Sequence, residues 1–157
     1  ADRKQTITVP QGAIFGDALP MVVRGFTGDL VKRGESIEAP YLERMLDLRL
    51  TRRTPVWKSA RMSRSEAPTP MSTSLGQISA ETYRVEYDSD LWMEFWVEDS
   101  GSRRLLGWQT STGERATITG STRAPYWTQS AQGQEALRNQ LGLQTSPFMR
   151  DLEVEPR

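Results

Sequence analysis

The sequence predicts a single α+β domain: an antiparallel β-meander at about residues 83–122, an amino-terminal β-α-β unit and a carboxy-terminal helix. Three observations predict it. The meander region alternates apolar and polar residues between turn sequences, as antiparallel strands do. Residues 17–26 place apolar side chains at helical spacing between two short alternating runs. The length of 157 residues fits one domain that buries its own core.

The amino-terminal unit spans residues 5–32. Gln5–Val9 alternates and ends at a proline, which favours a short edge strand. Asp17 is a residue type that caps helix amino termini, and an apolar stripe follows it. The stripe consists of Leu19, Val22, Val23 and Phe26. Gly28 suits the helix C-cap, and residues 29–32 are predicted to return as a strand.

The next segment changes its period part of the way along. Pro40 suits the first turn of a short helix at about 40–46. The leucines that follow alternate with polar residues, which predicts a strand at about 47–53. After the break at Pro55, residues 56–62 are predicted as a further strand.

Residues 65–81 are rich in serine, threonine and proline and show no periodicity. A connection of this length inside a compact domain is typically a binding loop or a disordered excursion. We therefore predict a flexible loop at about 65–81 within the single domain, and both alternatives stay open.

The meander centres on residues 91–109, which carry three of the five tryptophans. Because side chains alternate along a strand, residues 91–98 divide between two faces. The core face receives Leu91, Met93, Phe95 and Val97. The opposite face receives Trp92, Glu94, Trp96 and Glu98. A two-residue turn at Ser100–Gly101 predicts the register of the hairpin. It pairs Glu98 with Arg103, Trp96 with Leu105, Phe95 with Leu106, and Met93 with Trp108.

The carboxy-terminal helix is predicted at about residues 130–141. Its apolar edge contains Ala136, Leu137 and Leu141, and Gly142 would end it. This helix is a candidate cover for the tryptophan-bearing face of the meander.

The residue types exclude several kinds of chemistry. The chain has no cysteine and no histidine, so thiolate nucleophiles, disulfides and histidine-based triads are ruled out. The best carboxylate cluster, Asp88, Asp90 and Glu94, lacks the glycine and the bidentate glutamate of a calcium loop. We predict no catalytic residue, no metal site and no cofactor.

The charges are unevenly distributed although the net charge is zero. Residues 44–64 carry seven basic side chains and one acid, whereas residues 81–99 carry seven acids and one arginine. The two stretches either neutralise each other on adjacent strands or leave a basic face for an anionic partner such as nucleic acid. The candidate anion-binding residues are Arg49, Arg52, Arg53, Trp57, Lys58, Arg61 and Arg64.

The tryptophan-bearing face is the second candidate site. If nothing covers Trp92 and Trp96, they form an exposed aromatic platform flanked by Glu94 and Glu98. Such platforms bind protein partners, sugars or single-stranded bases, and the glutamates disfavour the last because they repel phosphate. Carbohydrate or small-ligand binding is therefore an alternative function for this face.

The amino-terminal sequence ITVPQGAIFGDALPMVVRGFTG resembles the opening of the short amino-terminal domains of secretins, TonB-dependent receptors and related pilus and conjugation proteins. The matching positions are Val9, Pro10, Gly12, Gly16, Asp17, Ala18, Leu19 and Gly28. The resemblance implies a module for assembly or interaction and carries over no catalytic residue. It also implies the periplasm as the location, with the cytoplasm as the alternative.

These observations together predict a non-enzymatic interaction or assembly module, a periplasmic component of a pilus, conjugation or secretion apparatus. We expect a protein partner or a homo-oligomer, with nucleic acid as the alternative. We expect no membrane-spanning segment, because no apolar run approaches about 20 residues.

Overall fold

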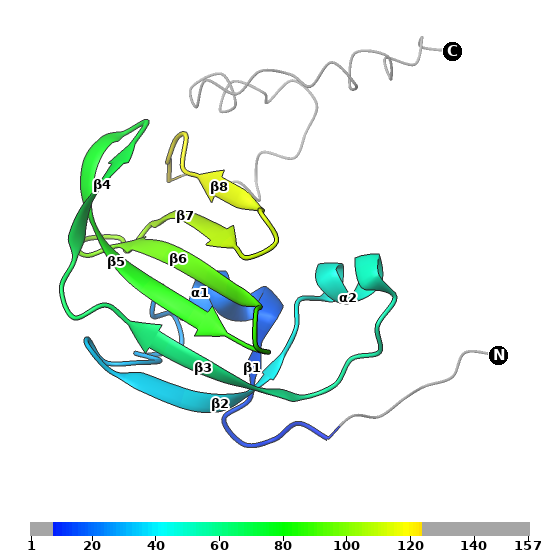
Figure 1. Ribbon diagram of the computed structural model, residues 1–157. Helices are drawn as coiled ribbons and strands as arrows, with labels where there is room; N and C mark the ends of the chain where they lie inside the picture. Colours follow the sequence, from blue (N-terminus) through cyan, green and yellow to red (C-terminus); the bar gives the residue numbers. More distant parts are fainter. Residues whose placement is uncertain (1–7, 124–157) are drawn as a thin grey trace, which may run out of the picture. The chain divides into compact units, whose positions relative to one another are not determined.

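The computed structural model describes residues 8–123. The chain divides into two units, residues 1–118 and 119–157. The described part of the second unit, residues 119–123, has no regular secondary structure. The first unit contains an eight-stranded mixed sheet, shown in Figure 1.

The sheet has the strand order β1-β2-β3-β5-β6-β7-β8, and β4 pairs with β5. The strands are β1 (Ile14–Phe15), β2 (Ser36–Leu42), β3 (Lys58–Arg64), β4 (Thr69–Thr73), β5 (Gly76–Glu86), β6 (Trp92–Glu98), β7 (Leu105–Thr110) and β8 (Arg115–Thr117). The helices are a 3₁₀ turn η1 (Gly16–Ala18), α1 (Leu19–Val22) and α2 (Met45–Thr51). Among these strands of the described residues, β1 and β2 pair in parallel and the other pairs are antiparallel.

The long strand β5 organises the sheet. Its second half pairs with β3, from Tyr83 to Glu86, and its first half pairs with β4, from Gly76 to Ala80. Its other edge pairs with β6 along the whole of β6. Residues from the basic and the acidic stretches therefore meet on neighbouring strands.

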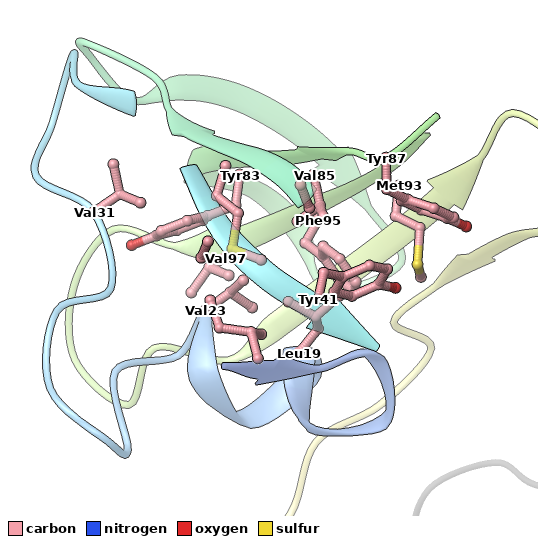
Figure 2. Packing of buried hydrophobic residues seen from close by; sticks show 14 residues of the cluster. Leu19, Val23, Val31, Tyr41, Tyr83, Val85, Tyr87, Met93, Phe95 and Val97 are labelled. Carbon is pink, nitrogen blue, oxygen red and sulfur yellow. The ribbon is translucent and has the colours of Figure 1, made fainter. Parts of the chain in front are cut away.

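The core lies on one face of this sheet, where α1 covers it (Figure 2). Leu19 and Val23 pack there against strand residues that include Tyr41, Phe95 and Val97, and all five are at most 1% exposed. Burying each large apolar side chain contributes about 1.5–3 kcal/mol. This face therefore holds the hydrophobic core of the first unit.

The predicted antiparallel meander is present as β5 to β8. The predicted division of β6 between two faces is also confirmed. Met93, Phe95 and Val97 are buried in the core, whereas Trp92 and Trp96 are half-buried on the opposite face.

The predicted register of the β6–β7 hairpin is wrong. Phe95 pairs with Trp108 and Trp96 with Gly107, and the register shifts between Trp96 and Val97. The turn is longer than two residues, because the Glu98 N–H donates to the Arg104 carbonyl at 2.9 Å. Phe95 and Trp96 each pair with the β7 residue two positions later than predicted. Because a shift of two residues keeps every side chain on its own face of the sheet, the predicted faces are unchanged.

The predicted amino-terminal unit is also placed incorrectly. Its helix is a single turn, its strands are β1 and β2, and residues 29–32 form no strand. The backbone turns at Gly25, with φ of 81°, and the Gly25 N–H donates to the Val22 carbonyl. Phe26 consequently lies outside the helix and is 65% exposed. Residues 5–7 of the predicted first strand lie outside the described residues.

The predictions for residues 40–53 are reversed. Pro40 lies in β2, and the leucine-rich segment predicted as a strand forms α2. Burial of Ala39 and Tyr41 on the core face favours the strand at the first position. Both oxygens of Asp17, far away in sequence, accept hydrogen bonds from the Met45 N–H at 3.1 and 3.3 Å, and so cap α2.

The predicted loop at 65–81 is a β-hairpin. β4 and the first half of β5 pair across a tight turn at Ser74–Leu75. Every residue of β4 is at least partly exposed. Alternation of apolar and polar residues arises when one face of a strand is buried, so the sequence of β4 does not show it. The predicted helix at 130–141 lies outside the described residues.

Candidate functional site

The tryptophan-bearing face of β6 carries its own arginines. The Arg84 guanidinium lies 4.3 Å from the ring centre of Trp92, and Arg115 lies 5.9 Å from that of Trp96. Glu94 lies 3.6 Å from Arg84 and accepts a hydrogen bond from Gln109. This face therefore combines two half-buried indoles with charges that are already partnered.

At the end of this face, Glu98 forms a hydrogen-bonded pair with Arg104, at 2.7 and 3.0 Å. The hydrogen bond from Arg104 lowers the pKa of Glu98 below its usual value. Glu98 thus belongs to the turn that sets the register of β6 and β7.

The structure does not bring the predicted anion-binding residues together on one surface. Arg61 lies on the outer face of β3, opposite Glu38 and Glu86 on the neighbouring strands. Arg64 lies on the core side, where only 8% of its side chain is exposed. The Trp57 indole packs edge-on against Phe15 at 5.4 Å and donates to a backbone carbonyl.

A buried carboxylate, Glu81, was not singled out by the sequence. It is 0% exposed and accepts hydrogen bonds from Arg33 at 2.6 Å, Arg64 at 2.7 Å and Arg103 at 3.1 Å. Burial raises the pKa of Glu81, but the hydrogen bonds from Arg64 and Arg33 outweigh it and lower the pKa below the usual value. Arg103 also donates to the Val23 carbonyl, which joins this cluster to the end of α1.

A second buried carboxylate, Glu43, directly follows the last residue of β2. It pairs with Arg53 at 2.8 Å and with Lys58 at 3.0 Å, and Lys58 also pairs with Asp88. A cavity of about 280 Å³ lies beside it. The cavity is lined by Glu43, Arg44, Asp47, Thr51, Arg53, Tyr87, Leu91, Thr110, Ser111 and Thr112.

The short helix α2 turns apolar side chains toward solvent. Met45 is 47% exposed, Leu46 56% and Leu50 75%, whereas Leu48 is buried. At 3.6 residues per turn, Met45, Arg49, Leu46 and Leu50 occupy one arc of about 140°. A helix on a protein surface normally places its apolar arc toward the core, so α2 has the reverse arrangement.

An apolar groove of about 200 Å³ lies beside this arc. It reaches the buried core residues Met93 and Phe95 and is also lined by Leu46, Pro20 and Trp108. Asp17 and Arg44 supply its polar lining, and Arg44 is held by Asp47 and Glu114 at 2.8 and 2.7 Å. We name the groove and the exposed arc of α2 together the α2 surface.

Two exposed arginines lie on or next to the α2 surface. Arg49 and Arg52 are exposed and form no ion pair with any residue in the range 8–123. Arg52 adopts a left-handed conformation, with φ of 53°, at the end of α2. Both arginines were predicted from the sequence as candidate anion-binding residues. The segment that forms α2 was predicted largely as a strand, and its pattern did not indicate that Leu46 and Leu50 face solvent.

Within residues 8–123, no group of three or more acidic side chains is arranged to hold a metal ion. No helix in this range has the length and apolar character needed to cross a bilayer. The chain matches no protein-family model, no curated protein and no solved structure.

Proposed function

We propose that this chain is a non-enzymatic protein-interaction module that docks a partner on the α2 surface. The observation that carries the proposal is the groove that opens beside exposed leucines and reaches Met93 and Phe95 in the core. Grooves of this kind accept an apolar anchor residue of a partner, and such anchors dominate binding energies. The neighbouring Leu46 and Leu50 would contact the partner around the anchor.

The charge arrangement supports interaction in preference to a charged active centre. Both buried carboxylates, Glu43 and Glu81, are paired with two or more cations. Burial raises the pKa of Glu81, but hydrogen bonds from Arg64 and Arg33 lower it below the usual value, so Glu81 is a poor proton donor near neutral pH. Of the two, the Glu43 cluster lies next to α2, because Arg53 comes just after the C-cap residue of that helix.

Photo-crosslinking in the cells that encode the protein tests the proposal. A photoreactive phenylalanine analogue at Leu46 or Leu50 should give one discrete adduct of higher mass, identified by mass spectrometry. The same analogue at Gln77, an exposed polar position on the β4–β5 hairpin, is the matched control. Adducts at Gln77 but none at either leucine would overturn the proposal.

Substitutions separate docking from folding. Leu46→Asp and Leu50→Asp change exposed positions and should leave the free energy of unfolding within about 0.5 kcal/mol of its original value. They should also abolish the adduct formed by an analogue at the other leucine. Leu48→Asp places a charge at a buried position and serves as the unfolded control.

We further propose that the module assembles in the periplasm, within a pilus, conjugation or secretion apparatus. This extension rests on the resemblance of residues 5–32 and not on the α2 surface. Protease added to spheroplasts should digest the native protein while a cytoplasmic marker survives. Protection equal to that of the marker would favour the cytoplasm and would end this extension.

A further inference from the structure

We infer that the partner docked on the α2 surface is an acidic, amphipathic helical segment, so this inference rests on the proposed function. One apolar side chain of the segment enters the groove beside Leu46, and carboxylates on its flank pair with Arg49 and Arg52.

The apolar half of the inference follows from the shape of the site. Helix-in-groove recognition uses an apolar anchor together with apolar neighbours one turn away. The α2 surface offers the matching features, a groove that reaches Phe95 and two leucines, Leu46 and Leu50, one helical turn apart. A partner helix crossing α2 would bury the anchor in the groove and its neighbours against the leucines.

The acidic half follows from two arginines that form no ion pair within residues 8–123. Arg49 lies inside the exposed apolar arc, so a partner that covers the arc also covers its guanidinium. A covered cation without a counter-ion is costly, which favours a carboxylate on the partner. Asp47, the acid of the same helix, is already held by Arg44.

The backbone at Arg52 gives independent support. A left-handed helix end is the position where glycine is most stable, because any other side chain there meets the backbone. Arginine at this position with φ of 53° therefore works against the fold and presents an exposed charge beside the arc. An acidic partner is one reason to keep an arginine here, and the favourable interaction of its charge with the carboxyl end of α2 is another.

An anionic membrane surface fits these observations less well. A bilayer provides no single side chain that could enter the groove beside Leu46 as an anchor. Membrane binding is therefore one of the outcomes that the experiment must separate.

The experiment selects ligands from a phage-displayed library of helical peptides against the full chain. The expected result is a set of peptides with two apolar residues one turn apart and with Asp or Glu beside them. Leu46→Ala should weaken the best peptide about tenfold or more. Arg49→Gln and Arg52→Gly should each weaken it about two- to fivefold, and added salt should remove that difference.

Charge reversal gives the sharpest control. With Arg49→Glu and Arg52→Glu together, the selection should turn from acidic to basic peptides while the apolar pattern stays. Peptides that depend on Leu46 but carry no acidic preference would overturn this inference and leave the proposed function standing. Peptides that bind Leu46→Asp as well as the original chain would overturn docking on the α2 surface itself.

Two further measurements close the alternatives. Co-sedimentation with phosphatidylglycerol vesicles that is lost in Leu50→Asp would overturn the inference in favour of a membrane surface. Concentration-dependent self-association lost in the same variant would overturn it in favour of a second copy of the chain. Absence of both is expected.

Discussion

Replacing the buried carboxylate Glu81 tests the largest electrostatic element of the fold. In Glu81→Gln, three arginines lose a charged partner but differ in what remains to them. Arg33 is 45% exposed and keeps its ion pair with Asp99, whereas the Arg103 guanidinium keeps the Val23 carbonyl and the Tyr83 hydroxyl. Arg64 is only 8% exposed, and its Nε already lacks a hydrogen-bond partner in the described structure. Without Glu81, the polar partners that remain to this buried guanidinium are the Val31 carbonyl at 3.2 Å and the exposed carboxylate of Asp29 at 3.6 Å, so the substitution is costly.

Breaking a buried ion pair by removing one partner costs about 3–5 kcal/mol. We expect Glu81→Gln to lower the free energy of unfolding by that amount at pH 7. Urea is the suitable denaturant, because guanidinium chloride is a salt and screens ion pairs. Glu86→Gln removes an exposed carboxylate paired with Arg84 and should cost at most about 1 kcal/mol.

The pH dependence follows from the lowered pKa of Glu81. A carboxylate whose pKa is lower in the folded chain stabilises it above the unfolded pKa of about 4.3. That stabilisation is lost as the pH falls through the folded pKa, which lies below this value. The difference between the original chain and Glu81→Gln should therefore be constant from pH 7 to about 5 and shrink in stronger acid. A cost below about 1 kcal/mol, or a difference independent of pH, would refute this reasoning.

A paired substitution distinguishes a stranded charge from lost packing. Glu81→Leu combined with Arg64→Met removes carboxylate and guanidinium together and keeps apolar volume. The double variant should be clearly more stable than Glu81→Leu alone. Equal stability of the two would mean that Arg64 is not the source of the cost.

Three further changes test local elements of the fold. Gly107→Ala would place a methyl group against the backbone of β8 and 3.2 Å from Cε3 of Trp96, so it should cost about 1–3 kcal/mol and alter tryptophan fluorescence; an unchanged spectrum would contradict the observed pairing. Asp17→Ala removes the cap on the Met45 N–H and should cost about 0.5–2 kcal/mol in thermal unfolding, with Asp17→Asn closer to the original chain. Arg52→Gly relieves the left-handed backbone and should leave the urea midpoint unchanged or raise it, whereas a clear drop would show that the arginine side chain stabilises the fold.

The meander was predictable because its signal is local. Residues 92–98 alternate so regularly that the sequence alone predicts which side chains enter the core. The β6–β7 register was not predictable, because the turn depends on Arg103, which adopts φ of 47° and reaches Glu81 and the end of α1. Those partners lie more than twenty residues away in the chain.

The elements that failed are those fixed by distant residues. Helix α2 is capped by Asp17, from a segment 28 residues earlier, so its own sequence carries no cap signal. β4 is partly or fully exposed along its length, and it is a strand because β5 pairs with it. Leucines at 46, 48 and 50 satisfy a strand period in the sequence, although only Leu48 is buried in the helix that forms.

The two charged stretches show how register decides between competing interpretations. Pairing of β3 with β5 sets Arg61 opposite Glu86, and Arg64 reaches Glu81 on the core side. Much of the basic stretch is thereby matched within the fold, as the neutralising interpretation predicts. Arg49 and Arg52 stand apart, because α2 carries them away from the strands.

Helix propensity does not account for the composition of the exposed arc of α2. Leucine and methionine are good helix formers, which is a reason to find them in a seven-residue helix that is marginal on its own. Lysine, glutamine and glutamate have similar propensities and expose no large apolar side chain to water. A helix selected only for stability would therefore carry such residues at 46 and 50. Leucine at both positions, with Leu46 lining a groove that reaches Phe95, therefore supports the proposed contact with a partner.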